Sequence, residues 1–411
     1  MTSQSNHHLT CPQGTFHLTR YPITDNTTLQ AWDGGDLLLL DHLATLNLAQ
    51  TSRVLIINDS FGALTCALSC AFSSALTNTL VGTNLAYYND SLVAQKALVQ
   101  NLAQNNLNPS PVTILTLDQF LSEPGEYDLV LGKIPKHLSY FQMILQVLRT
   151  KVHAGSQIIF AAMTRNISRG VYDTCTENFD AYQTSLAAKK ARLVFLPPIP
   201  KQTSDQFHDQ SPNQSPNHLP AQIEDLGIKE PWNGYTLVKL PNTFAHKGID
   251  KGSRLLVDNL PDLQGRMRIL DLGCGNGFLS LAAAHTYPEA EIVGIDESAL
   301  AVRSAQITFG THFPDRQGMF YQQDGFALEL EGDFDLILCN PPFHEQRAVN
   351  RKLALGLILE ASKYLSPEGL VLVVANSSLG YQGVFPNHFH QVTLVKQDRG
   401  FGVFRLSGFK D

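Results

Sequence analysis

A short apolar run that leads into a glycine-rich turn and then into an alanine-rich helix constrains the fold of this chain most. Residues 268–278 read Arg-Ile-Leu-Asp-Leu-Gly-Cys-Gly-Asn-Gly-Phe, and residues 279–285 continue as an apolar helical segment. A strand, a glycine turn and a helix in this order are typical of an open α/β sheet that binds its ligand at the carboxyl ends of the strands. A dinucleotide-binding fingerprint requires its third glycine at position 278, which is Phe, so the pattern disfavours NAD.

Two more apolar runs end in an acidic residue. Residues 291–295 end in Asp296, about twenty residues after the glycine turn, where a carboxylate accepts hydrogen bonds from ribose hydroxyls. Residues 319–323 end in Asp324, which is placed to meet the edge of an adenine. A single acid at a strand end commonly caps the next helix or turn, and this structural interpretation stands for each acid taken alone. Their order after the glycine turn favours a cofactor that carries ribose and adenine.

A fourth apolar run, residues 335–339, stops at Asn340-Pro341-Pro342-Phe343. Two consecutive prolines cannot extend a sheet, so they direct the chain out at the carboxyl end of the strand. Asn340 offers a side-chain acceptor, Pro341 a backbone carbonyl and Phe343 a stacking face, which together suit a planar base with an exocyclic amine. The alternative interpretation is a Pro-Pro turn that only closes a strand.

Together these motifs resemble the class I methyltransferases that use S-adenosylmethionine, over residues 244–406. Within that class, Asn-Pro-Pro-Phe-His at 340–344 and the segment 244–256 look like the bacterial ribosomal RNA guanine-N2 methyltransferases. The stretch Leu-Gln-Ala-Trp-Asp-Gly-Gly-Asp-Leu-Leu-Leu at 29–39 looks more like the large-subunit (23S) enzymes than the small-subunit (16S) enzymes. The sequence departs from the family at His246-Lys247, where the family has Ser-Arg, so no role is assigned to that pair.

The resemblance implies an α/β fold of the class I (Rossmann-like) type with a seven-stranded, mostly parallel sheet. It also implies S-adenosyl-L-methionine as cofactor, S-adenosyl-L-homocysteine as product, and no metal. The implied catalytic residues are Asn340, Pro341 and Phe343. The implied cofactor-binding residues are Asp271, Gly273, Gly275, Gly277, Asp296, Asp324 and Asn340, with Gly248 and Asp250 from the preceding segment. Arg254 lies in that segment too, where a packing role on an amphipathic helix is equally open.

The favoured function is transfer of a methyl group to the exocyclic N2 of a specific guanine in 23S ribosomal RNA, either naked or in an assembly intermediate. The Asn340 side chain and the Pro341 carbonyl would accept both amine hydrogens and favour a localised, in-line lone pair, so no strong general base is required. Phe343 would stack on the extruded base. Methylation of 16S guanine, of adenine N6 and of protein glutamine remain open. A non-catalytic RNA-binding protein on the same fold is a second class, and the intact glycine turn counts against it.

Composition limits the class of protein further. The 411 residues, 43% hydrophobic and 16% charged, predict a globular chain of two or three domains. No apolar run reaches membrane-spanning length and the start lacks a signal pattern, so we expect a cytoplasmic monomer without membrane association. The formal charge of −7 is unusual for a nucleic-acid binder, so any RNA site has to be a local basic patch. The six cysteines contain no Cys-x-x-Cys pair and are expected to be reduced thiols.

The first part of the chain repeats the pattern of the second. The matched segments are 53–64 with 268–279, 81–84 with 293–296, 127–135 with 334–342, and 155–160 with 369–374. Any two doubly wound halves look somewhat alike, which is the alternative explanation. Because the matches fall at every strand end and in the same order, we expect two tandem domains of one fold.

The first copy lacks the residues of the cofactor site. Ile56, Asn58, Ser60 and Asn84 replace Asp271, Gly273, Gly275 and Asp296. A backbone without these glycines cannot approach a ligand closely, so we expect a degenerate first domain that serves RNA recognition. The candidate RNA-binding residues are Lys133, which replaces Asn340, Lys136, Arg347 and Arg351, with Arg149, Lys151, Lys189, Lys190 and Arg192 as extensions of that surface. Each one alone has the alternative of an ordinary solvated side chain.

We expect the domain boundary near Pro241, which gives a degenerate domain at 1–240 and a catalytic domain at 241–411. Residues 201–222 are polar and proline-rich, and a disordered insertion is expected at about 200–222. It would lie inside the first domain, because residues 192–196 and 235–240 match 392–396 and 403–407. Each of these pairs would form antiparallel edge strands that finish a sheet.

Overall fold

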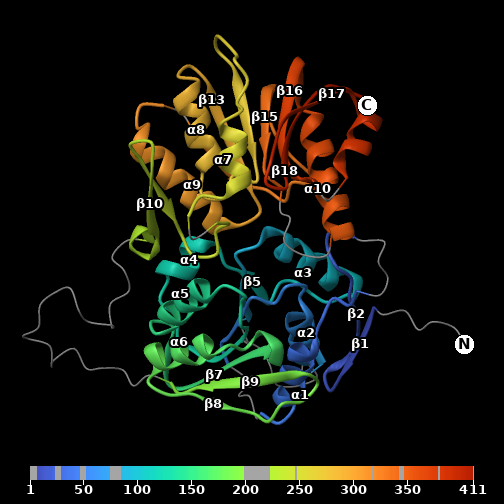
Figure 1. Cartoon of the computed structure of the whole chain (residues 1–411). Helices are drawn as coiled ribbons and strands as arrows, with labels where there is room; N and C mark the ends of the chain where they lie inside the picture. The colour runs from blue at the N-terminus through green and yellow to red at the C-terminus, as the bar shows by residue number, and fades with distance from the viewer. Residues whose placement is uncertain are drawn as a thin grey trace, which may run out of the picture. The chain divides into compact units, whose positions relative to one another are not determined.

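The computed structural model describes residues 7–23, 29–46, 52–74, 85–198, 223–245, 248–316, 318–341, 347–377 and 380–410. By its contacts the chain divides into two compact units, Met1–Ala221 and Gln222–Asp411, called here the first and the second unit. Each unit contains a seven-stranded sheet, helices on its faces, and a two-stranded hairpin that precedes it (Figure 1). Within the described ranges, none of the helices combines the length and the hydropathy that crossing a bilayer requires.

The sheet of the first unit has the strand order β5-β4-β3-β6-β7-β9-β8. Its strands are β3 (Val54–Ile57), β4 (Leu85–Tyr88), β5 (Val112–Ile114), β6 (Tyr127–Lys133), β7 (Val152–Met163), β8 (Gln183–Thr184) and β9 (Ala191–Leu196). Strands β3 to β7 pair in parallel, and β9 pairs antiparallel with β7 and β8. The hairpin consists of β1 (His8–Cys11) and β2 (Gly14–His17).

The sheet of the second unit has the order β14-β13-β12-β15-β16-β18-β17. Its strands are β12 (Arg268–Leu272), β13 (Glu291–Asp296), β14 (Gly318–Gln322), β15 (Phe334–Cys339), β16 (Leu365–Asn376), β17 (Phe389–Asp398) and β18 (Phe401–Phe409). Strands β12 to β16 pair in parallel, and β18 pairs antiparallel with β16 and β17. Here the hairpin consists of β10 (Ile228–Trp232) and β11 (Tyr235–Lys239).

Helices provide the crossovers that parallel neighbours require. Those of the first unit are α1 (Gly34–Leu43), α2 (Ala63–Ser74), α3 (Leu92–Gln104), α4 (Leu117–Ser122), α5 (Leu138–Leu148) and α6 (Arg169–Phe179), with the 3-10 turn η2 (Thr164–Asn166). Those of the second unit are α7 (Lys251–Val257), α8 (Phe278–Thr286), α9 (Ala299–His312) and α10 (Arg347–Ser362), with the 3-10 turns η3 (Ile223–Leu226), η5 (Tyr381–Gly383) and η6 (Phe385–Asn387).

Alternate residues of the central strands enter two different hydrophobic cores. In the second unit, Ile269 and Ile292 pack into one cluster, while their neighbours Leu270 and Val293 pack into another. Successive side chains of a strand point to opposite faces, so both faces of the sheet are covered. This confirms the predicted α/β class with two seven-stranded, mostly parallel sheets.

The two sheets correspond strand for strand, which confirms the predicted duplication. The residues just before Lys133 and Asn340 pair with Ile57 and Leu272, the last residues of the two central strands. Both β6 and β15 also carry a register shift at the same place, near their first residue. Lys133 and Asn340 therefore occupy the same point of the fold, as the sequence match predicts.

The register also corrects two of the segment matches. The residue after β4 stands where Asp296 ends β13, and this residue is Asn89. The predicted match of Asp296 with Asn84, which lies outside the described residues, is therefore wrong. The match of residues 155–160 with 369–374 is one residue out of register.

The prediction that residues 235–240 close the first sheet is also wrong. They form β11, which pairs with β10, and Leu237 is fully buried in the core of the second unit. The strand that pairs with β9 at the edge of the first sheet is the short β8. The division between the units accordingly falls after Ala221 and not near Pro241, and the expected insertion lies within residues 199–222, outside the described ranges.

Helix side chains hold each hairpin by its backbone, which explains why β11 belongs to the second unit. The Thr308 hydroxyl on α9 accepts a hydrogen bond from the Val238 N–H at 3.0 Å. In the first unit, the Asn105 side chain at the C-cap of α3 accepts from the His17 N–H of β2 at 2.8 Å and donates to the His17 carbonyl at 2.7 Å. The hairpins are thus equivalent parts of the repeat, and β11 begins the second copy.

Candidate active site

The glycine turn of the second unit leaves open space beside its backbone. Gly273 and Gly275 have φ angles of 76° and 54°, a region that strongly favours glycine. A β-carbon at Gly273 would meet no atom within 4 Å. Both residues line a cavity, which fits the predicted close approach of a ligand to the turn.

Gly277 has a different reason to be glycine. It has a φ of 80°, and a β-carbon there would lie 2.9 Å from the Cα of Ala305 on α9. Its counterpart Gly62 has a φ of 79° and would meet the Cα of Leu98 at 3.1 Å. Since the first unit keeps this glycine and has lost the other two, we infer that Gly277 serves helix packing and not contact with a cofactor.

Asp271 is fully buried and caps the helix that follows the turn. One of its oxygens accepts from the Ser280 N–H at 2.9 Å and from the Ser280 hydroxyl at 2.6 Å. The other oxygen is buried and has no hydrogen-bond partner among the described residues. Burial raises the pKa of Asp271 to about 7. A buried carboxylate oxygen without a donor is unfavourable, so the site favours a ligand that brings positive charge or a donor.

Asp296 supports the glycine turn from the neighbouring strand. One of its oxygens accepts from the Gly275 N–H at 3.0 Å, and the other from the Ser298 N–H at 3.0 Å. The capping interpretation of this acid therefore applies. A carboxylate oxygen carries more than one lone pair, so bonds to ribose hydroxyls remain compatible with these contacts.

Asp324 and Gly248 are not part of the cavity lining that surrounds the turn. Asp324 is buried and accepts from the Phe326 and Ala327 N–H groups at 2.9 Å each, so it caps a turn. Its contact with adenine stays a prediction. The Gly248 carbonyl accepts from the Lys239 ammonium at 2.7 Å, so this residue is tied to the fold through its backbone.

Asp250 and Ser253 bring the segment before the glycine turn into contact with the end of β15. Asp250 is the N-cap of α7, where it accepts from the Ser253 N–H at 2.9 Å. The Asn340 side-chain NH₂ donates to the same Asp250 oxygen at 3.0 Å and to the Ser253 hydroxyl at 2.7 Å. Three residues from two distant parts of the chain therefore form one hydrogen-bonded group.

This group determines the orientation of the Asn340 amide. An ionised carboxylate only accepts hydrogen bonds, so the amide nitrogen has to face Asp250. The amide oxygen then points the other way, and no described residue donates to it. Asn340 lines the same cavity as the glycine turn, so its oxygen is an available acceptor at this site. Asp250 thus orients Asn340, a role different from the predicted contact with the cofactor.

The cavity has a volume of about 30 Å³. Its lining comprises Phe244, Ala245, Ile249, Asp250, Ser253, Gly273, Cys274, Gly275, Asn276, Phe278, Leu279 and Asn340. Open glycine backbone and apolar side chains make up much of this lining, and the buried Asp271 lies two residues before Gly273 in the chain. The predicted residues Asp250, Gly273, Gly275 and Asn340 are therefore brought together.

Pro341, which follows Asn340 after the end of β15, is buried, and Phe343 lies outside the described residues. Arg347 and Arg351 belong to α10, and their predicted contact with RNA stays a prediction.

Two residues that contact the site, Lys239 and Ser253, were not predicted from the sequence. Lys239 is fully buried, and its ammonium donates to the carbonyls of Ala245 and Gly248 at 3.2 and 2.7 Å, which fixes the segment that leads into α7. Ser253 was detectable in principle, because Asp250-Lys-Gly-Ser repeats the spacing of Asp-Gly-Gly-Asp at residues 33–36.

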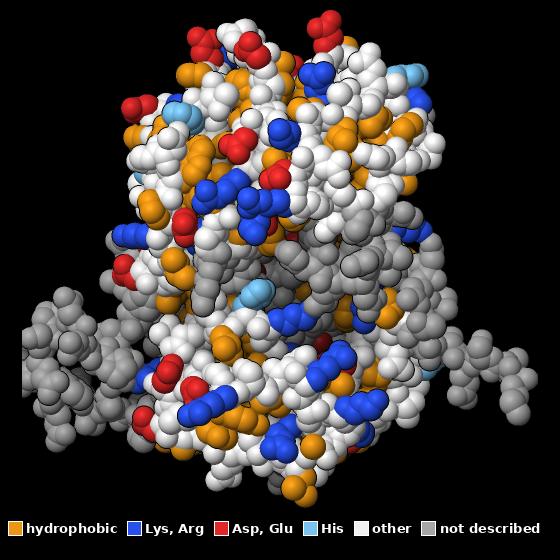
Figure 2. All heavy atoms as spheres, in the orientation of Figure 1, with side chains coloured by type: hydrophobic (Ala, Val, Ile, Leu, Met, Phe, Trp, Pro, Cys, Tyr) orange, Lys and Arg blue, Asp and Glu red, His pale blue; other side chains and the backbone are white. Residues whose placement is uncertain are grey.

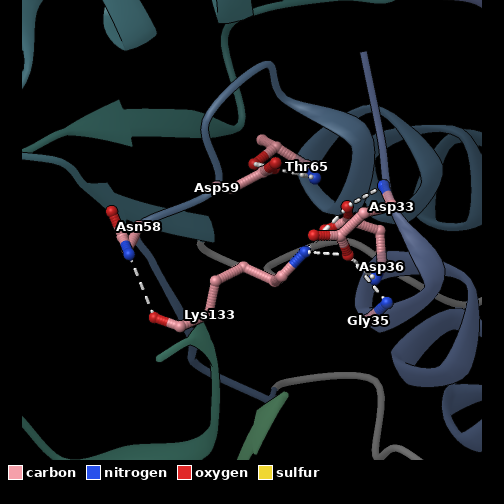
Figure 3. Close-up of polar contacts among 7 residues, drawn as sticks. All are labelled: Asp33, Gly35, Asp36, Asn58, Asp59, Thr65 and Lys133. Carbon is pink, nitrogen blue, oxygen red and sulfur yellow. Dashed lines mark hydrogen bonds and ion pairs between the residues drawn. The ribbon is translucent and has the colours of Figure 1, made fainter. Parts of the chain in front are cut away.

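The first unit contains the counterpart of this group, with different chemistry (Figure 3). The Lys133 ammonium lies 2.6 Å from Asp33 and 2.8 Å from Asp36, and Asp33 caps α1 as Asp250 caps α7. The charge of Lys133 is therefore paired inside the unit, and its predicted contact with RNA stays a prediction. Lys151 is likewise fully buried, whereas Lys136 is exposed.

Charges in this group stabilise one another. Burial alone would lower the pKa of Lys133, but the two carboxylates more than offset it, so the pKa is raised. Burial raises the pKa of Asp36, while Lys133 outweighs the effect of burial on Asp33 and lowers the pKa of Asp33. Lys133 therefore stays protonated at neutral pH.

The turn of the first unit is held by its own side chains. Asn58 adopts a positive φ of 59° at the point where Gly273 has a φ of 76°, and its side chain donates to the Lys133 carbonyl at 3.1 Å (Figure 3). Asp59 accepts from the Thr65 N–H at 3.0 Å and from the Thr65 hydroxyl at 2.9 Å, the bonds that Asp271 makes with Ser280. Burial raises the pKa of Asp59 to about 6.

Family comparisons agree with this division of the chain. Residues 6–200 match the model of the RLMG N-terminal domain, and residues 234–405 match the methyltransferase small domain. The chain is 33% identical to the ribosomal RNA large subunit methyltransferase G of Pseudomonas syringae pv. tomato, over 94% of this chain and 96% of that protein. It is 35% identical to the protein of the same name from Stutzerimonas stutzeri, over 97% and 98%.

A solved structure covers both units. The Thermus thermophilus 16S rRNA N2 G1207 methyltransferase, in complex with AdoMet and guanosine, superposes with a TM-score of 0.66 over 99% of this chain and 100% of that chain. Its sequence identity of 19% supports a shared fold and nothing finer. The tandem methyltransferase architecture predicted from the sequence is thereby confirmed.

Proposed function

This chain belongs to the ribosomal RNA large subunit methyltransferase G family, and from that premise we propose that it methylates the exocyclic N2 of a guanine in 23S ribosomal RNA. It is an S-adenosylmethionine-dependent ribosomal RNA methyltransferase by family and fold. Guanine as the base and N2 as the methylated atom belong to the proposal.

The observation that carries the proposal is the orientation of Asn340. Its NH₂ is held by Asp250 and Ser253, so its oxygen is left to accept a hydrogen bond from an amine at the cavity. With the Pro341 carbonyl as a second acceptor, both hydrogens of an exocyclic amine would be bound. The lone pair of the amine nitrogen would then point at the methyl group that is transferred. The orientation of the amine, and not the strength of a general base, would limit the rate of such a transfer.

The cofactor would lie against the glycine turn. Bound S-adenosylmethionine supplies a methyl group that is already activated by positive charge, so the amine proton can leave after transfer. Gly273 and Gly275 would allow the cofactor to approach the backbone of the turn closely. Asp296 would accept hydrogen bonds from the ribose hydroxyls, and Asp271 would face the positive charge of the cofactor. Phe343 would stack on the base.

The proposal prefers guanine in 23S RNA over three alternatives. The large-subunit name of the relatives favours 23S over 16S RNA. Asn-Pro-Pro-Phe-His at 340–344 favours guanine N2 over adenine N6 and over protein glutamine by resemblance. The solved 16S enzyme carries guanosine in its title, which is compatible with a guanine pocket on this fold.

The proposal also assigns roles to the two units and names the form of the RNA substrate. The first unit would recognise RNA and the second would catalyse, on naked 23S RNA or on an assembly intermediate. Since that substrate is cytoplasmic in bacteria, we place the protein there, as a monomer.

A methyl-transfer assay tests the proposal directly. The purified full-length chain is incubated with methyl-labelled S-adenosylmethionine and either 23S RNA, 16S RNA or large subunits, and the modified nucleoside is identified by mass spectrometry. We expect N2-methylguanosine at one position of 23S RNA. Asn340→Ala should lower kcat by roughly 100-fold or more while cofactor binding is retained, since it removes an acceptor used in the transition state. Label in 16S RNA, in adenosine or in protein would contradict the proposal.

A further inference from the structure

Two lysines at a hairpin tip of the first unit adopt a backbone conformation that lysine rarely takes. Between β8 and β9, Lys189 has a φ of 52° and Lys190 a φ of 59°. The flanking Ala188 and Ala191 exchange hydrogen bonds of 3.0 and 2.8 Å, so the lysines are the central pair of a two-residue turn. Positive φ at both positions is typical of a type I′ turn, for which Asn-Gly is preferred. Two lysines there are strained.

The second unit has the equivalent hairpin and the expected residue in it. Between β17 and β18, Arg399 has a φ of 44° and Gly400 a φ of 88°. Glycine thus occupies the position at which the first unit has Lys190. Because glycine would relieve the strain, the presence of Lys190 calls for a reason other than folding.

Other basic residues lie around this tip. The Thr164 N–H and hydroxyl bind the Lys190 carbonyl at 2.8 and 3.1 Å, so Arg165 follows directly beside the tip. Arg169 begins α6, one turn later. We call Arg165, Arg169, Lys189 and Lys190 the tip cluster; all four are exposed. In Figure 2, several Lys and Arg side chains lie over the part of the first unit that carries β7, β8 and β9 in Figure 1, separated by apolar and neutral side chains.

Half of the cluster is paired with acids. Lys189 lies 2.6 Å from Asp41, and Arg169 lies 3.8 Å from Asp173. Within the described parts of the chain, no acidic side chain pairs with Arg165 or Lys190. Two unpaired charges on a chain of net charge −7 form a local basic patch of the kind an RNA binder with acidic composition requires.

The tip also lies at the functional edge of the sheet. Strand β7 runs parallel to β6, and Met163 at its carboxyl end pairs with Ala191, directly after the tip. Lys133 marks the same edge on β6, as Asn340 does in the second unit. The tip cluster therefore stands at the edge that the fold uses for ligands.

We propose that the tip cluster binds the phosphate backbone of the RNA substrate, with Arg165 and Lys190 as its principal contacts. The proposal rests on the proposed function, because it takes ribosomal RNA as the ligand. Phosphate contacts position an RNA without reading its sequence, which suits a unit that has lost its own cofactor site. The strain at Lys190 is retained because the charge is needed at that point.

Lys190→Gly separates a role in RNA binding from a role in folding. Binding of transcribed 23S RNA to the full-length chain is measured at several salt concentrations, together with Tm and S-adenosylmethionine affinity. We expect affinity to fall roughly five- to tenfold at about 0.1 M salt, and the slope of log K against log salt to decrease by about 1. Tm should stay the same or rise by a few degrees, because the turn is relieved, and cofactor affinity should not change.

Matched variants complete the test. Arg399→Asn removes a basic residue at the equivalent tip of the second unit and should leave RNA binding unchanged, whereas Arg165→Gln should weaken it as Lys190→Gly does. Lys190→Arg keeps charge and strain and should bind normally. Unchanged affinity and salt slope in both Lys190→Gly and Arg165→Gln would overturn the proposal. If the wild-type chain neither binds nor methylates 23S RNA, the proposed function fails instead, and the wild-type arm shows this.

Discussion

The end of β6 in the first unit and the end of β15 in the second each contribute one residue to a group of three bonded side chains. The three positions are equivalent in the two units, but the residues at them differ in chemistry. In the second unit, Asp250 and Ser253 hold the neutral amide of Asn340 and leave its oxygen available. The first unit has Asp33, Asp36 and Lys133 at these points, and the ammonium closes on both carboxylates. One scaffold thus supports an open acceptor in one copy and a closed ion pair in the other.

In each unit an acidic residue accepts hydrogen bonds from the first turn of the helix that follows the central strand, and the position of this acid differs between the units. Asp271 and Asp59 make the same two bonds, to Ser280 and to Thr65, although they stand at different points of the strand and turn. The first unit therefore shows that α2 can be capped without an acid at the place of Asp271. We infer that Asp271 is retained at the strand end of the second unit for the cofactor and not for the helix alone.

Lys133→Ala should give the largest effect on stability. Removal of the ammonium leaves the buried Asp36 carboxylate uncompensated beside the half-exposed Asp33 carboxylate, which should cost less than the about 3 to 5 kcal/mol that breaking a fully buried pair costs. The free energy of unfolding of the first unit is measured by urea denaturation, while cofactor affinity is measured by calorimetry. The exposed Lys136→Ala is the control and should change stability by less than about 0.5 kcal/mol. If Lys133→Ala lowered cofactor affinity and left the free energy of unfolding unchanged, the group around Lys133 would belong to a cofactor site, as the group around Asn340 does, and the difference between the units would be contradicted.

Asp296→Ala should weaken S-adenosylmethionine binding by about 1.5 to 3 kcal/mol, because it removes charge-assisted bonds to the ribose. Isothermal titration calorimetry measures this loss. Asn89→Ala, at the same point of the first unit, should leave cofactor affinity unchanged. Equal affinity of wild type and Asp296→Ala would reduce Asp296 to a cap of the turn.

Asp250→Ala tests whether the orientation of Asn340 matters for turnover. The amide would lose one of its two acceptors and turn more freely, so kcat should fall roughly tenfold while KM for the cofactor changes little. Asp250→Asn keeps an oxygen at this point, caps helices well and should restore most of the activity. Asp33→Ala is the matched control: it removes the equivalent cap in the first unit and should lower stability but not kcat of the folded enzyme. A similar loss of kcat in both variants would indicate a general folding defect.

The smallest expected effect is a pH dependence of cofactor binding. Burial raises the pKa of Asp271 to about 7, so its carboxylate gains its charge as pH rises through that value. Affinity for the positively charged cofactor should therefore increase a few-fold between about pH 6 and pH 8, and Asp271→Asn should remove this increase.

Stability of the ligand-free chain should move in the opposite direction. The folded-state pKa of Asp271 lies above its ordinary value of 3.8, so the folded state binds the proton more tightly. The contribution of Asp271 to stability is then greatest at low pH and is lost as pH rises from about 4 to 7. Asp59→Asn, at a group with a pKa of about 6, is the control and should alter stability with pH but not cofactor affinity. Cofactor affinity independent of pH would contradict the role of Asp271.

Residues at strand ends were predictable because their place follows from local pattern. The glycine turn, Asp296, Asn340 and the equivalence of Asn340 with Lys133 could all be derived from the sequence. The partners of Lys133 could not, since Asp33 lies a hundred positions away and only the fold brings the two together.

The edge strands and the strand register could not be predicted correctly from the sequence, and the reasons are physical. Strand β8 has two residues, too few to show an alternating pattern, while the longer apolar β11 resembled a closing strand and proved to be the hairpin of the second unit. Asn84 and Asn89 each follow a short apolar run, and only the pairing of β3 with β4 decides between them.

Calorimetric titration of the full-length chain with S-adenosylmethionine tests the difference between the two units most directly. The account predicts one site per chain, weakened by Asp296→Ala and unaffected by Asn89→Ala, because in the first unit Asn58 and Ser60 replace the two glycines of the turn and Lys133 is paired with Asp33 and Asp36. Two equivalent sites per chain, or a single site lost in Asn89→Ala and kept in Asp296→Ala, would contradict it.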